Sequence, residues 1–413
     1  MFPELEAIPT RESEEMRKDL DKLSPEARSI IRAQVTRRSL LVGAGAIGAA
    51  TFLASCSSDS ETGAVTSPED VGGTVRWGNW TAYLDQKKVD GKRTYPTLNA
   101  FTQSTGIDVD YLVDYNDNDE FYGKVQENLK AGNDIGYDIV TPTDWMAARW
   151  IRLGYAQELD ASNIPNKGNI LDTLANVSFD TGRNYSMTWQ SGFAGFGWNK
   201  DVIKEDIVSV DQLFSAKYKG RVEVLSEMRD TMGIILQYQG VDISQPFTED
   251  EFMTAIDFLK KMISDGFIRQ VKGNDYLEDM ANGDAIAVIG WSGDMFSENL
   301  SGQNYGFSIP ESGGTLWSDN MLIPSTSANK SNSEQLMNHY YDPAIAAEVA
   351  AWVNYICPVK GAQEEMEKID PELASSPFIF PDDETLSKVQ VFRGLSAEEE
   401  FNFSAAFQEA IGA

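Results

Sequence analysis

Strand-like and helix-like segments alternate along the chain from residue 73, and this alternation restricts the possible folds more than any other feature of the sequence. Apolar segments typical of strands lie at 74–77, 108–113 and 137–141. Helical patterns follow them at 95–105, closed by Gly106, at 118–130, with Asn118 as the expected N-cap, and at 144–153, between Thr143 as N-cap and Gly154. This βαβαβα order predicts an α/β fold.

A second group of segments predicts a second lobe. Strands are expected at 193–198, 221–225, 285–289 and 306–309, and helices at 229–239 and 251–264. Removal of residues 1–55 would leave 413 − 55 = 358 residues, which is too many for one ordinary hydrophobic core. We therefore expect two α/β lobes.

Residues 36–56 resemble a bacterial twin-arginine lipoprotein signal, because Arg37 and Arg38 precede a short apolar run and small residues lead to Cys56. The run at 40–54 is shorter than the roughly 20 residues that a membrane-spanning helix needs. We expect 1–55 to be a signal peptide and 56–72, which is rich in small and polar residues, to be a flexible tether. A lipid on Cys56 would then be the only attachment of an exported protein to the cell membrane.

The formal net charge of −30 survives maturation, because residues 1–55 hold eight basic and eight acidic side chains. Such a surface disfavours nucleic acid and attracts cations, although a solubilising surface has the same composition. Cys357 would be the only thiol left after lipidation, so we expect no intramolecular disulfide. A nucleophilic pair of Cys357 with the single histidine, His339, is disfavoured because Cys357 lies in an apolar segment. We expect no catalytic residue, cofactor or metal.

Short motifs in a fixed order carry a family resemblance. They include Asn79-Trp80-Thr81-Ala82-Tyr83, the segment 137–144, Gly197-Trp198-Asn199, Tyr218-Lys219-Gly220, Trp291-Ser292-Gly293 and Trp317-Ser318-Asp319. Together they span about residues 73–410 and resemble the spermidine/putrescine-binding proteins of polyamine ABC importers. Each motif alone would be weak, whereas the ordered set is specific.

The resemblance implies a two-lobed periplasmic-binding-protein fold of type II-like topology, with a ligand cleft between lobes joined by a hinge. It implies that lobe 1 consists of 73–192 plus 320–362, and lobe 2 of 193–319 plus 363–413. The implied protein is a monomeric binder, not an enzyme, that delivers a polyamine to an ABC transporter permease.

The chemistry of a polyamine gives an independent expectation. Each ammonium group requires carboxylate acceptors, and the methylene groups between them favour aromatic walls. Acids and aromatic residues do occur together in the motifs, as Trp80 with Tyr83, Asp144 with Trp145, Trp291 with Asp294, and Trp317 with Asp319. Any one pair could equally be a core tryptophan beside a helix cap.

By position, the resemblance assigns ligand contacts to Trp80, Tyr83, Thr143, Asp144, Trp145, Glu227, Asp230, Trp291, Trp317, Asp319, Tyr355 and Gln390. The chain departs from the family at Glu227 and Asp230, where the two acid types are exchanged, and at Ile356-Cys357-Pro358 after Tyr355. It also adds a basic loop at 86–94, which is either solvated or in contact with a permease.

Two other functions stay open. A binder of another solute, such as an amino acid, sugar or metal, could use the same fold. An amino-acid binder should present an arginine to the ligand carboxylate, and the candidate Arg229 is expected to be neutralised by Glu227 and Asp230. An extracytoplasmic hydrolase would need an acid and a base, which Asp144 and Glu227 could supply across a cleft.

Overall fold

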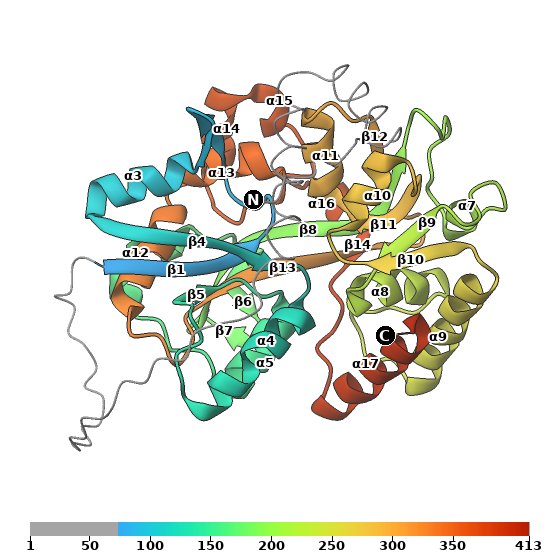
Figure 1. Ribbon diagram of the computed structural model, residues 1–413, viewed down its shortest axis with the longest axis horizontal. Helices are drawn as coiled ribbons and strands as arrows, with labels where there is room; N and C mark the ends of the chain where they lie inside the picture. Colours follow the sequence, from blue (N-terminus) through green and yellow to red (C-terminus); the bar gives the residue numbers. More distant parts are fainter. Residues whose placement is uncertain (1–72, 413) are drawn as a thin grey trace, which may run out of the picture. The chain divides into compact units, whose positions relative to one another are not determined.

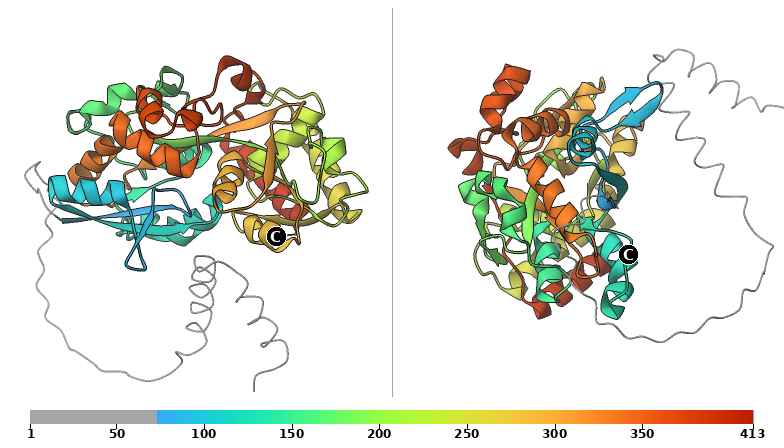
Figure 2. Two further views of the ribbon diagram at one scale, coloured as in Figure 1. Left: turned by 90° about the horizontal axis from the view of Figure 1, so that it is seen from above. Right: turned by 90° about the vertical axis from the view of Figure 1, so that its left-hand side faces the viewer.

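A computed structural model describes residues 73–412 of the chain, in which helices lie on both sides of one mixed sheet (Figures 1 and 2). The strands of the sheet follow the order β10-β9-β11-β8-β13-β5-β1-β4, with β12 added to β8 and β14 to β13. In this order their bounds are β10 Ile268–Lys272, β9 Val222–Leu225, β11 Ala287–Trp291, β8 Ser186–Asn199, β13 Gly314–Leu322, β5 Ile139–Val140, β1 Gly73–Trp80, β4 Ile107–Tyr115, β12 Tyr305–Ser308 and β14 Val389–Gln390.

Helices and two small hairpins complete the described part. The helices are α3 Pro96–Thr105, α4 Asn118–Ala131, α5 Asp144–Arg152, α6 Asp172–Ala175, α7 Val210–Leu213, α8 Met228–Tyr238, α9 Glu249–Ser264, α10 Tyr276–Asn282, α11 Ser292–Leu300, α12 Lys330–Tyr340, α13 Pro343–Val353, α14 Ala362–Ile369, α15 Pro371–Ala374, α16 Asp383–Leu386 and α17 Ala397–Ile411. The hairpins are β2 Lys87–Val89 with β3 Lys92–Thr94, and β6 Asn176–Val177 with β7 Asp180–Thr181.

Strands β8 and β13 connect the two halves of the sheet. The first part of β8 pairs with almost the whole of β13, from Met187 opposite Met321 to Ala194 opposite Thr315, while its second part pairs with β11 and β12. Figure 1 shows both strands running from the side of β1 and β4 to the side of β9 and β10. The predicted lobe limits place the passage of the chain from one lobe to the other near residues 192 and 320. Both positions lie inside the paired strands β8 and β13, and the lobe limits themselves stay a prediction.

The predicted alternation of strands and helices is confirmed, and local chemistry explains the element ends. Gly106 ends α3 in the left-handed conformation (φ 75°), which glycine adopts without steric cost. The expected cap of α4 is wrong by one residue, because Asp117 accepts hydrogen bonds from the amides of Asp119 and Glu120 while Asn118 is buried. Strand β10 was not predicted, since three of the five residues in its sequence Ile-Arg-Gln-Val-Lys are charged or polar.

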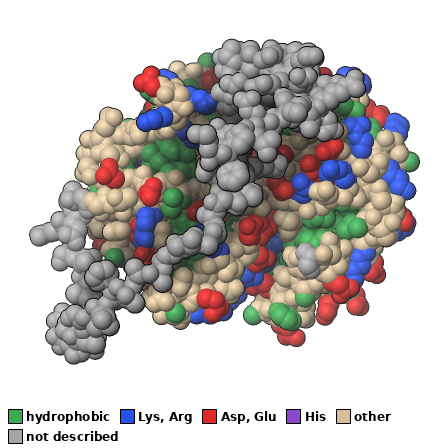
Figure 3. Space-filling model, in the orientation of Figure 1, with side chains coloured by type: hydrophobic (Ala, Val, Ile, Leu, Met, Phe, Trp, Pro, Cys, Tyr) green, Lys and Arg blue, Asp and Glu red, His purple; other side chains and the backbone are tan. Residues whose placement is uncertain are grey.

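The basic segment 86–94 forms the exposed hairpin β2–β3, with Lys87 opposite Thr94 and the turn residues Asp90 and Gly91 at positive φ. Figure 3 shows acidic side chains on both halves of one face, with basic side chains among them. Within residues 73–412, none of the helices is both long and apolar enough to cross a membrane. The predicted signal peptide and tether, with Arg37, Arg38 and Cys56, lie outside the described residues.

Candidate functional site

Every predicted contact residue except Gln390 lines one cavity, here called the main cavity, which encloses about 760 Å³ including space open to solvent. The predicted residues in its wall are Trp80, Tyr83, Thr143, Asp144, Trp145, Glu227, Asp230, Trp291, Trp317, Asp319 and Tyr355. Gln390 lies beside the cavity in β14, where its side-chain oxygen accepts a hydrogen bond from the Ile243 amide at 2.9 Å. Ligand contact by these residues stays a prediction.

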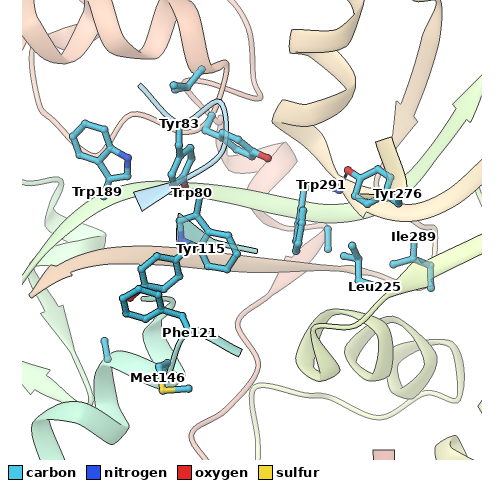
Figure 4. Packing of buried hydrophobic residues seen from close by; sticks show 14 of the residues in the cluster. Trp80, Tyr83, Tyr115, Phe121, Met146, Trp189, Leu225, Tyr276, Ile289 and Trp291 are labelled. Atoms are coloured by element: carbon cyan, nitrogen blue, oxygen red, sulfur yellow. Dashed lines mark hydrogen bonds between the residues drawn. The ribbon is translucent and has the colours of Figure 1, made fainter. Parts of the chain in front are cut away.

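The end of β1 supplies Trp80, and the turn after it supplies Tyr83. The Trp80 indole donates to the Thr141 carbonyl at 2.8 Å, and its ring lies 5.0 Å from that of Tyr115. Ala82 adopts φ 51°, which is uncommon for a residue with a Cβ and reverses the chain so that Tyr83 also enters the wall. Figure 4 shows the rings of Trp80, at the end of β1, and Trp291, at the end of β11, separated by an open space.

Asp319 enters the cavity because β13 is irregular at this point. Its register against β8 shifts between Ser318 and Asn320, which releases Asp319 from the ladder and pairs it with Thr143 instead. The Asp319 carboxylate accepts hydrogen bonds from Thr143 Oγ1 at 2.7 Å and from Tyr83 Oη at 2.9 Å. Thr143 therefore precedes α5 as predicted, but its hydroxyl donates to Asp319 and forms no capping bond.

The N-termini of α5 and α8 bring three more acids to the cavity. Asp144 begins α5 and accepts a 2.7 Å hydrogen bond from Asn320. Glu227 precedes α8 and accepts hydrogen bonds from the Asn118 side chain at 2.8 Å and its amide at 3.3 Å. Asp230, in the first turn of α8, accepts from the Trp291 indole at 2.8 Å. Asn118 and Glu227 belong to opposite predicted lobes, so with those limits their contact would bridge the cleft at this point.

Asp294 is a wall residue that the predicted contact set omitted. It accepts hydrogen bonds from Tyr276 at 2.7 Å, Tyr355 at 2.8 Å and Asn274 at 3.1 Å. Its place beside Trp291 in the sequence was the available signal, because an acid in the first turn of α11 must lie near the end of β11. The other wall residues outside the predicted set are Thr81, Arg229, Asn274, Thr315, Leu316, Val391 and Phe392.

Glycines allow the aromatic wall to pack closely. The Trp317 and Tyr355 rings lie 5.3 Å apart, and both approach Gly192 of β8. A Cβ on Gly192 would lie 2.5 Å from Trp317 and 2.8 Å from Tyr355, so no larger residue fits without moving these rings. The ring centres of Trp291 and Trp317 lie 6.4 Å apart. Trp291 thus extends the aromatic wall to Asp230, to which its indole donates a hydrogen bond.

The electrostatics of the cavity are strongly negative. Its lining holds five carboxylates, Asp144, Glu227, Asp230, Asp294 and Asp319, against one guanidinium, that of Arg229, which gives 1 − 5 = −4 when all are ionised. Burial raises the pKa of Asp319 to about 7 and that of Asp144 to about 6. Burial also raises the pKa of Asp230 and Asp294, and it raises that of Glu227 well above the ordinary value, with Asp117 adding to the effect.

Arg229 forms an ion pair with Glu400 of α17, at 3.6 Å. Glu227 and Asp230, which the sequence suggested as its partners, interact electrostatically with Arg229 as well. The Glu400 carboxylate also binds Arg149 at 3.0 Å and Arg152 at 3.1 Å, both from α5.

Other chemistry has little geometric support in the described residues. No group of three or more His, Cys, Asp or Glu residues in 73–412 is arranged to hold a metal ion. Burial raises the pKa of Cys357 to about 12, and His339 contacts the Thr97 carbonyl at 3.0 Å, so these two side chains form no nucleophilic pair.

Known proteins are similar to this chain in sequence and in fold. The spermidine/putrescine-binding periplasmic protein of Salmonella typhimurium (strain LT2) is 28% identical over 318 residues, which cover 76% of this chain and 85% of the relative. A putrescine-binding periplasmic protein of Escherichia coli (strain K12) is 27% identical over 336 residues, with the same coverage of 76% and 85%.

The solved structure of a spermidine/putrescine ABC transporter substrate-binding protein from Streptococcus pneumoniae matches with a TM-score of 0.66 at 24% identity, over 82% of this chain and 98% of that chain. This likeness confirms the predicted fold class, a two-lobed α/β periplasmic-binding-protein fold. The family model for bacterial extracellular solute-binding proteins matches residues 96–379, which is more than half of the 413 residues. The chain therefore belongs to the bacterial extracellular solute-binding proteins.

Proposed function

We propose that this protein captures a polyamine, putrescine or spermidine, outside the cytoplasm and delivers it to the permease of an ABC importer. The observation that carries the proposal is the main cavity, where five carboxylates, four of them buried, and several aromatic rings surround one space. The relatives named above as spermidine/putrescine-binding and putrescine-binding proteins support the same ligand class.

A polyamine would satisfy the cavity in two ways. Its ammonium groups would supply the positive charge that buried carboxylates require, and each would donate charge-assisted hydrogen bonds to oxygens such as those of Asp319 and Asp294. Its methylene groups would pack between Trp80, Trp291 and Trp317, whose faces attract a cation by about 0.5 to 2 kcal/mol each.

A neutral sugar would leave the carboxylates without counter-charge, and an amino acid would place its own carboxylate among them. Hydrolysis also fits poorly, because Asp144 and Glu227 are held by Asn320 and Asn118. We therefore propose a binding role without catalysis.

Isothermal titration calorimetry of the purified protein tests the proposal. Putrescine, spermidine and spermine are the probes, and 1,4-butanediol is the neutral control with the length of putrescine. At least one amine should bind while the diol gives no heat. Binding of the diol, or binding of no amine by a folded protein, would contradict the proposal.

We further propose that the mature protein is a monomer attached to the membrane by a lipid on Cys56 after export by the twin-arginine route. The sequence at 36–56 supports this part of the proposal. A lipid anchor would keep the binding protein near its permease.

A further inference from the structure

Arg229 is the one basic side chain among the described residues that line the main cavity. Its guanidinium lies 4.2 Å from the centre of the Trp145 ring and 6.0 Å from that of Phe392. Its Nε is buried and has no hydrogen-bond partner among residues 73–412, and its side chain is only 11% exposed. Ring contacts and the ion pair with Glu400 therefore hold a buried cation in the cavity wall.

A second hollow lies behind this part of the wall. Three residues, Trp145, Glu227 and Arg229, line both the main cavity and the second hollow. The acids that line the second hollow but not the main cavity are Asp117, Asp119 and Glu120. Arg229 thus lies in the partition between two acidic spaces.

The acids form a row that continues through the partition. In the aromatic wall, the Tyr355 hydroxyl donates a hydrogen bond to Asp294, and the Trp291 indole donates one to Asp230. The charges of Asp230 in the main cavity and of Asp117 in the second hollow both raise the pKa of Glu227. A polyamine with three ammonium groups would find carboxylates on both sides of the partition, and Arg229 is the cation between them.

We propose that Arg229 is a specificity-determining residue that excludes a third ammonium group, so that the site accepts diamines and rejects longer polyamines. This inference rests on the proposed polyamine-binding function. The guanidinium supplies from the chain itself the positive charge that a third ammonium would bring, and like charges repel strongly in a water-poor site. Without Arg229, the same ammonium would reach Glu227 and the second hollow.

The first test compares putrescine with spermidine by calorimetry in the parent and in two variants. Arg229→Gln removes the charge, and Arg229→Lys keeps it as the matched control. The parent should bind putrescine at least tenfold more tightly than spermidine, and Arg229→Lys should keep this preference. In Arg229→Gln the spermidine-to-putrescine affinity ratio should rise at least tenfold, because spermidine gains affinity.

A double variant tests whether the third ammonium binds in the second hollow. Asp117→Asn in the Arg229→Gln background should lose most of the gained spermidine affinity, while putrescine affinity stays unchanged. Asparagine is as good an N-cap as aspartate, so α4 should remain intact.

A ligand-side test needs no variant and separates charge from length. Spermidine acetylated on one terminal amine is longer than spermidine but has one positive charge fewer. If charge repulsion excludes spermidine, the acetylated form with its remaining charges in the main cavity should bind the parent at least tenfold more tightly than spermidine. Equal exclusion of both forms would assign the selectivity to length and overturn the inference.

The outcomes distinguish the two proposals. If both amines bind and their affinity ratio is the same in the parent and in Arg229→Gln, Arg229 does not set specificity, although polyamine binding stands. If the parent prefers spermidine to putrescine, Arg229 does not exclude a third ammonium group, and the inference is wrong. If the folded parent binds neither amine, the proposed function itself fails, and the inference fails with it.

Discussion

Replacing Asp319 with asparagine should strengthen the ligand-free fold and weaken polyamine binding. The two effects have opposite signs because the same charge is unfavourable in a buried cavity and favourable beside an ammonium group. Asparagine keeps the volume of the side chain, and its amide oxygen and nitrogen can still pair with the hydroxyls of Thr143 and Tyr83.

The stability effect follows from the raised pKa of Asp319. The pKa rises from 3.8 to about 7, a difference of 7 − 3.8 = 3.2. At 1.36 kcal/mol for each pKa unit, ionisation costs the ligand-free fold at most about 4 kcal/mol. An acid whose pKa is raised on folding binds more protons when folded, so the fold loses stability as pH rises from about 4 to about 7. The advantage of Asp319→Asn should grow over this range and then level off.

The binding effect follows from the lost charge-assisted hydrogen bond. Such a bond contributes roughly 1.5 to 3 kcal/mol, so putrescine affinity at pH 8 should fall about ten- to a hundredfold. In the parent, affinity should also fall as pH drops below about 7, because protons compete with the amine for the carboxylates of Asp319 and Asp144.

Urea unfolding at pH 5 and pH 8, and calorimetry with putrescine at pH 8, measure the two effects. Asp85→Asn is the matched control, since Asp85 is buried with a raised pKa but lies outside the main cavity. That control should leave putrescine affinity unchanged. Unaltered affinity of Asp319→Asn would refute the cation-site assignment, and a lower stability of this variant at pH 8 would show that the Asp319 carboxylate holds the fold together.

Three more predictions follow from other parts of the structure. Gly192→Ala should cost about 1 to 3 kcal/mol of stability and lower ligand affinity, measured by unfolding and calorimetry, because its Cβ would displace Trp317; full affinity would show that the wall relaxes freely. Glu400→Gln should weaken closure, because it breaks the ion pair with Arg149, and small-angle scattering with saturating putrescine should then show less compaction than in the parent. Cys56→Ser should release intact protein from the membrane fraction, and unchanged fractionation would contradict the lipid anchor.

The sequence predicted those elements that carry strong local signals, and no limits of a strand or helix were predicted beyond residue 309. The helix at 95–105 was delimited by Gly106, and apolar runs marked β9 and β11. The pairing of distant strands could not be predicted. No pattern in the segment 186–199 indicates that β8 pairs with β13 over one part and with β11 over another, because this pairing depends on segments about a hundred residues away.

The positions of the site residues were predictable, whereas their interactions were not. Family motifs placed Thr143 and Asp319 in one cavity, but the hydrogen bond between them depends on an irregularity in β13 that no sequence pattern marks. Asp294 was visible beside Trp291, yet its three hydrogen-bond donors come from distant segments. The same limit explains Arg229, whose partner Glu400 lies 171 residues further along the chain, since 400 − 229 = 171.

The buried acids explain how a cation could control the closure of this cleft. Where opening of the cleft returns both carboxylates to water, ionisation of Asp319 opposes the closed cavity by up to about 4 kcal/mol, and that of Asp144, with a pKa near 6, by up to (6 − 3.8) × 1.36, or about 3 kcal/mol. Moving a two-state equilibrium from 1:99 to 99:1 takes about 5.5 kcal/mol. A ligand that removes the cost of these two charges therefore has enough energy to convert an open population into a closed one. A neutral solute of the same shape would leave that cost in place, so closure should depend on the charge of the ligand more than on its contact area.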